Sequence, residues 1–314
     1  MMRTLSYRIV QFVLVSLCLS AIAFILMKLA PGDPVLAILR ASDGALSQAD
    51  QEAVREELGL NRPIYEQYAS WLSHIVRLDW GRSMTSNRDV WAMLAERLPA
   101  TVYLALGALL VLALISLPLG LLAAKYKGGV PDILSRTVAL LGASVPSFWL
   151  GLLLVYVFAF KLNWLPAMGS GSVRHLLLPS VTLGFVMAPE YIRLLRAGLL
   201  ETLSQEYIRA ARSRGIAEWR VMLRHALRAA LLPVVAVSGI SLGALLAGSV
   251  VTETLFGWPG LGSLAIEAIR LRDYPVIQGY VVLSGCFFLL ANWASDIGIS
   301  ALDPRIRLEK GRRS

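Results

Sequence analysis

The sequence predicts an all-α, polytopic membrane protein with six transmembrane helices, both termini in the cytoplasm, and a small helical extracytoplasmic domain between helices 1 and 2. Hydrophobic residues make up 56% of the 314 residues and charged residues 16%, with a mean hydropathy of +0.63. These values are far from those of a soluble domain. The apolar residues form long uncharged runs, and basic residues collect in alternate connections between them.

The transmembrane helices are predicted from the uncharged runs, because about 20 apolar residues are needed to cross roughly 30 Å of hydrocarbon. A sixth, weaker run covers residues 176–200; it is uncharged up to Pro189 and then contains Glu190, Arg193 and Arg196. We include this run as a sixth span, because an even number of spans places both termini on the same, cytoplasmic side of the membrane. The five clear runs are Ile9–Met27, Leu98–Ala124, Thr137–Phe160, Ala229–Thr252 and Tyr274–Ser295.

The charge distribution sets the orientation. The net charge of +9 arises almost entirely from the N-terminus, residues 125–136, residues 193–228 and the C-terminus, which the positive-inside rule places in the cytoplasm. Because the basic residues lie between apolar runs and not on a soluble face, no nucleic-acid partner is expected. We predict a multi-pass protein of the cell inner (plasma) membrane, in contact with membrane lipid.

The runs divide the chain into segments. Residues 1–30 form an N-terminal transmembrane helix, which we interpret as uncleaved because Lys28 stands where a signal-peptide cleavage site needs a small residue. Residues 31–98 form the extracytoplasmic helical insertion, with a capped amphipathic helix ending near Gly59. Residues 99–300 form a five-helix transmembrane core that contains the loop 201–229, and residues 301–314 form a cytoplasmic tail.

The loop 201–229 is predicted to be a stiff helical elbow. Residues 205–214 contain no Gly or Pro, and Gly215 is placed to end that helix in a left-handed turn. The second helix carries an apolar face and a separate basic stripe. A solvated loop bound to lipid phosphates is the alternative, but the apolar face favours a protein partner. The face is Trp219, Met222, Leu223 and Ala226, and the stripe is Arg220, Arg224 and Arg228.

This loop resembles the cytoplasmic coupling loop of permease subunits in binding-protein-dependent ABC importers. Their pattern is Glu-Ala-Ala, three residues, Gly, nine residues, Ile-x-Leu-Pro; here Arg209-Ala210-Ala211 precedes Gly215, and His225-Ala226-Leu227-Arg228 follows. The first Glu, the Ile and the final Pro are absent, and Glu206-Tyr207-Ile208-Arg209 is similar to the dipeptide, oligopeptide and nickel branch.

Seven further motifs extend the resemblance along the chain. They are Pro31-Gly32-Asp33-Pro34, Leu58-Gly59-Leu60, Gly81-Arg82-Ser83, Leu98-Pro99-Ala100-Thr101, Trp258-Pro259-Gly260-Leu261-Gly262, Asp273-Tyr274-Pro275 and Asp303-Pro304-Arg305.

The resemblance implies a transport subunit that is moved by a separate ATPase. Its expected partners are a second permease subunit, ATP-binding cassette subunits and an extracytoplasmic solute-binding protein. The chain has no GxxxxGK[ST] motif, so we expect it to be no enzyme, with no cofactor and no catalytic residue of its own. The ATPase-coupling residues would be Glu206, Arg209, Ala210, Ala211, Arg212, Gly215 and Trp219.

Two further groups of residues are candidates for transport itself. Glu190, Gly239 and Gly243 are candidates for the translocation path; pairing of Glu190 with Arg193, and close helix packing at the glycines, are the alternatives. The candidates for an external gate lie in and beside the loop that follows the fifth span, where an interfacial helix anchored by Trp258 is the alternative. These are Glu253, Trp258, Gly260 and Asp273.

The substrate is predicted from one short motif. Trp164-Leu165-Pro166-Ala167-Met168-Gly169 resembles nickel-import permeases of this family, which favours nickel or a metal chelate, with dipeptides or oligopeptides as the alternative. No metal site is expected in the chain itself, because its three histidines and two cysteines show no ligand spacing. A secondary transporter and a membrane-embedded enzyme are disfavoured, since neither inverted repeats nor clustered catalytic groups are evident.

Overall fold

The computed structural model describes residues 61–302 apart from residue 78, together with residues 10, 13–22, 24, 25, 52, 55 and 56. The predicted insertion helix near Gly59 other than residues 52, 55 and 56, the tail 301–314 beyond residue 302, and three of the short motifs lie outside the described residues. Those motifs are Pro31-Gly32-Asp33-Pro34, Leu58-Gly59-Leu60 and Asp303-Pro304-Arg305.

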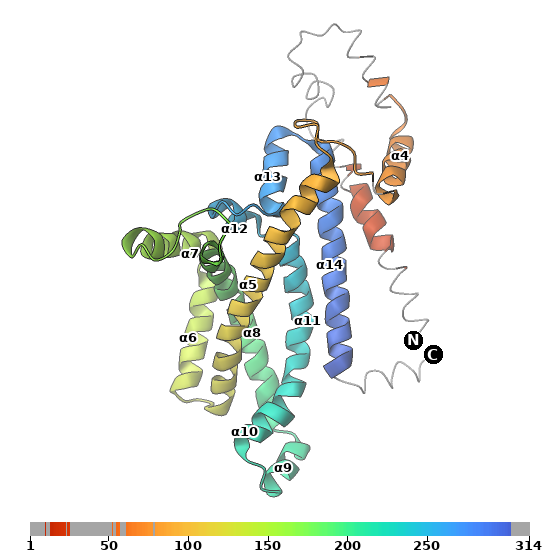
Figure 1. Ribbon diagram of the computed structural model, residues 1–314. Helices are drawn as coiled ribbons and strands as arrows, with labels where there is room; N and C mark the ends of the chain where they lie inside the picture. Colours follow the sequence, from red (N-terminus) through yellow and green to blue (C-terminus); the bar gives the residue numbers. More distant parts are fainter. Residues whose placement is uncertain are drawn as a thin grey trace. The chain divides into compact units, whose positions relative to one another are not determined.

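The described residues are helical (Figure 1), apart from loops and one antiparallel bridge between Arg82 and Asp89. The chain divides into two compact units, residues 1–100 with 259–286 and residues 101–258 with 287–314. The first unit contains α4 (Ile64–Val76), α13 (Leu261–Leu271) and the starts of α5 (Val90–Lys125) and α14 (Tyr274–Leu302).

The second unit contains the rest of α5 and α14 and the elements between them. These are α6 (Val130–Ser144), α7 (Ser147–Leu154), the π-helix η1 (Val155–Lys161), α8 (Val173–Leu203), α9 (Glu206–Ser213), α10 (Glu218–Arg220), the π-helix η2 (Val221–Ala226), α11 (Leu227–Leu246) and α12 (Val250–Leu255).

Three helices in the described part of the chain are long and apolar enough to cross a membrane. They are Val90–Lys125, Glu218–Leu246 and Tyr274–Leu302, and the bent pair Val130–Ser144 with Ser147–Lys161 is a fourth candidate. Val13–Ile22 is a shorter apolar helix, and α8 is long but more polar. The prediction of a helical membrane protein is confirmed, whereas six spans and cytoplasmic termini stay predictions.

The predicted span Thr137–Phe160 is a pair of helices that meet at a bend in the structure. The chain bends by 102° between α6 and α7. Proline has no N–H and disfavours the helical conformation of the residue before it, and Val145 accordingly adopts an extended conformation ahead of Pro146. Pro118 and Pro189, by contrast, lie inside the continuous helices α5 and α8.

The predicted span Ala229–Thr252 also differs at both ends. On its N-terminal side, α10, η2 and α11 form one helical run, so the second arm of the elbow continues directly into the span. On its C-terminal side, α11 ends at Leu246 and Gly248 takes a φ of +105°, a conformation that favours glycine. The short helix α12 then begins at Val250.

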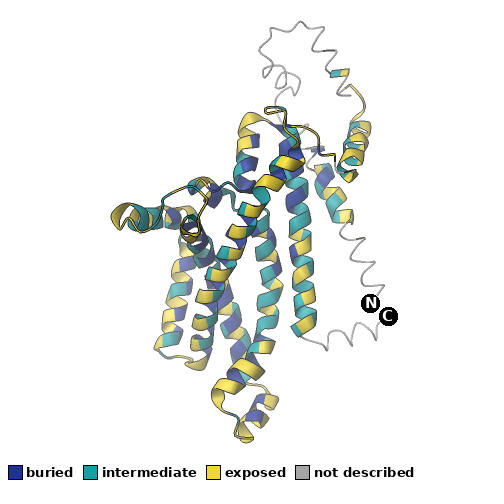
Figure 2. Cartoon of the chain, in the orientation of Figure 1, coloured by how far each residue is buried: buried dark blue, intermediate teal, exposed yellow. Residues whose placement is uncertain are grey.

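The buried core of the second unit reaches the loop 201–229 (Figure 2). Its members are small or aliphatic and come from α5, α8, α9, η2 and α11, so burying them joins the loop to three long helices. They are Ala124, Leu195, Leu199, Ile208, Ala211, Val221, Ala226 and Ala230.

Candidate functional site: the coupling loop

In the candidate coupling loop, residues 201–229, helix α9 ends in a Schellman motif at Gly215. Gly215 has a φ of +74°, and its N–H donates to the Arg212 carbonyl at 2.9 Å. The N–H of Ile216 donates to the Ala211 carbonyl at 3.3 Å. These two bonds satisfy the last carbonyls of α9 and fix the direction in which the chain leaves it. The predicted glycine-centred turn is thus present.

An ion pair bridges the elbow. The guanidinium of Arg212 donates to both carboxylate oxygens of Glu218, with distances of 2.6 Å and 3.0 Å. This hydrogen bonding raises the pKa of Arg212 from its ordinary value. Both side chains are over two-fifths exposed, so the pair contributes at most about 1 kcal/mol to stability. Its bidentate geometry favours one relative orientation of the two arms.

One face of α9 anchors the loop. Ile208 and Ala211, three residues apart, are buried at 0% and 5% exposure against Leu195 and Leu199 of α8 and Val221 of η2. Because helical residues three or four apart share a face, the rest of α9 points outward. Ala211, one of the predicted coupling residues, is therefore an anchor and not part of the exposed surface.

The outer face of the loop carries the other predicted coupling residues. Trp219 is 60% exposed, with Arg220 stacked over its ring at 5.1 Å, and Tyr207 and Leu223 are both 49% exposed. This outer face combines charge with large apolar groups, as protein interfaces do. The other predicted coupling residues that are exposed are Glu206, Arg209, Ala210, Arg212 and Gly215.

The apolar face predicted for the second helix is wrong in part. Met222 and Ala226 are buried, whereas Trp219 and Leu223 are exposed. The reason is the π-helix η2, whose i→i+5 bonding turns each residue through a smaller angle than an α-helix and rotates the faces apart.

The glycines proposed for the translocation path pack within the chain. A Cβ on Gly239 would lie 2.5 Å from the Ser295 Cβ, and one on Gly243 would lie 2.6 Å from the Phe288 ring. Both glycines thus allow α11 to approach α14 closely. This arrangement favours the helix-packing alternative.

The pairing predicted for Glu190 is wrong. Glu190 and Arg193 are both exposed, and neither belongs to an ion pair among the described residues. Arg196, one turn further along α8, instead pairs with Asp132 at 2.7 Å. Sequence reasoning missed Asp132, because it is 64 residues away in a basic connection.

The candidates for an external gate are mostly buried anchors. In the second unit, Glu253 is 0% exposed and accepts a hydrogen bond from the Thr101 hydroxyl at 3.1 Å, and Trp258 is 5% exposed. The burial of Trp258 disfavours the interfacial-anchor alternative. In the first unit, Gly260 caps the N-terminus of α13, and Asp273 is 2% exposed.

Asp273 holds the segment that precedes α5. Its carboxylate accepts hydrogen bonds from the Ser83 hydroxyl, from the Met84 N–H at 3.1 Å and from the Thr85 hydroxyl at 2.8 Å. Two of the short sequence motifs, Gly81-Arg82-Ser83 and Asp273-Tyr274-Pro275, therefore meet. In the described ranges, no three His, Cys, Asp or Glu side chains are grouped to hold a metal ion.

The chain belongs to the family of binding-protein-dependent transport system inner membrane components. The family model matches residues 116–308, and the model for the N-terminal part of such components matches residues 1–105. The chain is therefore a permease subunit of a binding-protein-dependent ABC importer and an inner-membrane protein, as the sequence motifs predicted.

Among relatives, the chain is 41% identical over 288 residues to the glutathione transport system permease protein GsiC of Escherichia coli (strain K12). The aligned region covers 92% of this chain and 93% of that relative. GsiC of Shigella flexneri serotype 5b (strain 8401) is 40% identical with the same coverage.

Solved structures share the fold. Two crystal forms of the inward-facing MetNI methionine ABC transporter match with a TM-score of 0.57, at 20% and 21% identity. They cover 67% and 68% of this chain and 96% and 97% of the matched chains.

Proposed function

We propose that this permease, with a second permease subunit, forms the path by which a small peptide of the glutathione type enters the cell. Support comes from the 41% identity to a glutathione permease over 92% of the chain. The preference for nickel, which depended on the motif at 164–169, finds no such support. The alternative predicted from the sequence, peptide import, fits better.

The observation that carries the mechanism is the two-sided coupling loop. Ile208 and Ala211 bind it to the core of the long helices, and Glu206, Arg209 and Trp219 face outward on the same rigid elbow. We propose that ATP-binding cassette subunits grip this outer face. A displacement of the elbow then moves α8 and α11 with it, because the three share one close-packed core.

The proposed topology has six spans with both termini in the cytoplasm. The segment boundaries are 1–30, 31–98, 99–300 and 301–314, with the coupling loop on the cytoplasmic side and an extracytoplasmic solute-binding protein delivering the peptide. Glu190 supports a second permease beside α8, since it is exposed, and a lipid-facing acid at a span centre costs about 2.5–3.5 kcal/mol, by the insertion value for Asp. A protein neighbour or a polar path removes that cost.

The test is uptake by the assembled transporter in proteoliposomes. The chain, its second permease and its ATPase subunits are reconstituted, and solute-binding protein loaded with radiolabelled glutathione is added outside. We expect accumulation that requires internal ATP and continues when ion gradients are collapsed with ionophores. Unlabelled tripeptide should compete, and a nickel chelate should not.

One outcome would contradict the proposed mechanism, and another would contradict only the proposed substrate. Uptake driven by an ion gradient without ATP would remove the importer mechanism. ATP-dependent uptake of nickel chelate, with no competition by peptides, would leave the mechanism and restore the substrate first predicted from the sequence.

A further inference from the structure

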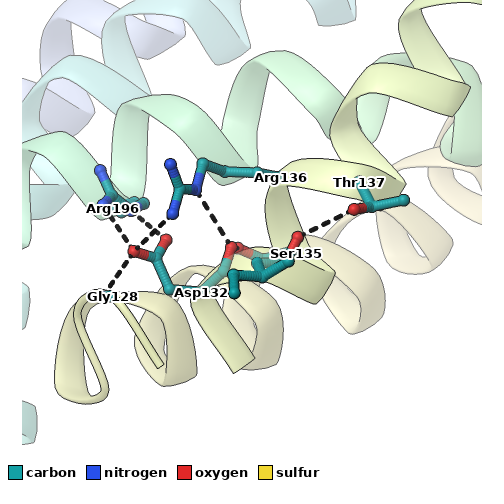
Figure 3. Close-up of polar contacts among 7 residues, drawn as sticks. Gly128, Asp132, Ser135, Arg136, Thr137 and Arg196 are labelled. Atoms are coloured by element: carbon teal, nitrogen blue, oxygen red, sulfur yellow. Dashed lines mark hydrogen bonds and ion pairs between the residues drawn. The ribbon is translucent and has the colours of Figure 1, made fainter. Parts of the chain in front are cut away.

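A buried carboxylate joins the start of α6 to α8 (Figure 3). Asp132 is 1% exposed, and its two oxygens accept hydrogen bonds from Arg196 Nε at 2.7 Å and Arg196 Nη2 at 2.9 Å. The Gly128 N–H donates to the same carboxylate at 2.9 Å. Arg136, 60% exposed, adds a longer contact of 3.4 Å. Arg196 is thus the principal partner, and its bidentate geometry fixes both distance and direction.

The ion pair lies beside the anchor of the coupling loop. Arg196 is adjacent in sequence to Leu195 and three residues from Leu199, and both leucines pack against Ile208 and Ala211 of α9. The same turn of α8 therefore contacts the coupling loop with its apolar side chains and α6 with its charged one. A displacement of α9 reaches Arg196 through close-packed groups.

Further along, α6 and α8 are packed without intervening side chains. A Cβ on Gly142 would lie 2.8 Å from the Pro189 ring, so α6 rests directly on α8 there. Close packing of this kind resists displacement where it occurs. The bidentate pair adds a directional restraint at the opposite end of α6, where this close packing does not hold α6 to α8.

Beyond α6, contacts continue to the segment predicted as the external gate. After the bend at Pro146, α7 packs on α12, where a Cβ on Gly151 would lie 2.5 Å from Leu255 and 3.3 Å from the Phe256 ring. The same short helix α12 carries the buried Glu253. All of these residues belong to the second unit. Movement of α6 thus has a packed route to α12.

We propose that Asp132 and Arg196 are positioning residues that make α6 follow α8 when the coupling loop is displaced. This inference rests on the proposed function. Without the pair, α8 still moves with the loop, but α6 lags behind and the motion reaches α12 incompletely. ATP is then hydrolysed without a matching transfer of substrate.

The test compares the same substitution at the two arginines that contact Asp132. Arg196→Met and Arg136→Met are each assembled with the partner subunits in proteoliposomes, and the ATP hydrolysed per peptide imported is measured. We expect the ratio to rise by roughly tenfold for Arg196→Met, within the usual range of coupling energies, and to stay at the wild-type value for Arg136→Met.

A double variant separates coupling from folding. Arg196→Met alone leaves the buried Asp132 short of its main partner, which destabilises a protein, whereas removing both charges is often neutral for stability. Asp132→Asn with Arg196→Met should therefore insert and melt like the wild type and still show the raised ratio. A purely structural pair predicts a normal ratio in this variant.

The outcomes are distinguishable from failure of the proposed function. If the wild-type assembly shows no ATP-dependent uptake, the proposed function fails first. If the wild-type assembly imports peptide with ATP and the double variant hydrolyses the same amount of ATP per peptide imported, the positioning role of Asp132 and Arg196 is refuted. The proposed function then still stands.

Discussion

The carboxylate of Asp273, at the start of α14, accepts a hydrogen bond from the hydroxyl of Ser83, 190 residues earlier in the chain. Both residues are nearly fully buried. With Met84 and Thr85 also donating to it, the carboxylate fixes the segment before α5 onto the turn that ends α13. Asp273 thus organises the first unit of the fold and is not free to act as a mobile gate.

Replacing this carboxylate should destabilise the protein. Asp273→Ala removes the acceptor of three donors, including the buried Ser83 hydroxyl, and should lower the free energy of unfolding by about 1–3 kcal/mol. Thermal melting of the detergent-purified protein measures the effect. Glu267→Gln, at an exposed position of the adjacent α13, is the control and should melt within a degree or two of the wild type; equal melting of the two variants would contradict the anchoring role.

Gly215→Pro should uncouple transport without preventing membrane insertion. Proline is restricted to φ near −65° and has no N–H, whereas Gly215 has a φ of +74° and donates to Arg212. The motif that ends α9 is therefore lost. We expect uptake to fall at least tenfold while the amount of protein in the membrane is unchanged.

A control for this position is another glycine with a positive φ. Gly171 has a φ of +102° and, like Gly215, open space where a Cβ would lie. Gly171→Ala and Gly215→Ala impose the same kind of strain, of order 1 kcal/mol. Only the change at Gly215 should reduce uptake, and equal losses would show that glycine strain alone is responsible.

An aspartate should raise protease sensitivity at Ala211 of α9 but not at the adjacent Ala210. Ala211→Asp places a carboxylate in the apolar core beside Ile208 and Val221, which costs several kcal/mol, so the loop should detach and become sensitive to protease. Ala210→Asp points outward and should leave protease sensitivity unchanged. Limited proteolysis of inverted membrane vesicles reads out both; rapid cleavage of both variants would contradict the orientation of α9.

The packing of α11 on α14 should tolerate no added volume at Gly243. A valine there clashes with Phe288, and overpacking typically costs about 1–3 kcal/mol. Ala244→Val, at the exposed neighbouring position, is the matched control. A lowered melting temperature for Gly243→Val alone is expected, and equal melting of both would support a path-lining role for Gly243 in place of packing.

The elbow was predictable because its signal is local. A helix-forming stretch interrupted by one glycine at 215 specifies where a helix ends, and the structure places the turn there. The bend at Pro146 likewise depends on one residue type. Both features follow from backbone chemistry within a few residues, without knowledge of the neighbours.

The features that the sequence analysis missed depend on long-range packing. The π-helix η2 rotates Trp219 outward, and no residue between 221 and 226 signals this geometry by itself. Asp132 and Arg196 both lie in basic surroundings, where an exposed, solvated charge is the default expectation. Only the packing of α6 on α8 reveals that they are partners.

The continuity of Glu218–Leu246 has a geometric consequence. This run of 29 residues is about 43 Å long at 1.5 Å per residue. A rotation of about 10° around its midpoint shifts the two tips in opposite directions by about 4 Å, a distance comparable to the helix rearrangements of known switching proteins. In the proposed topology, a small displacement of the cytoplasmic end of this run is therefore accompanied by an opposite displacement of similar size at its other end.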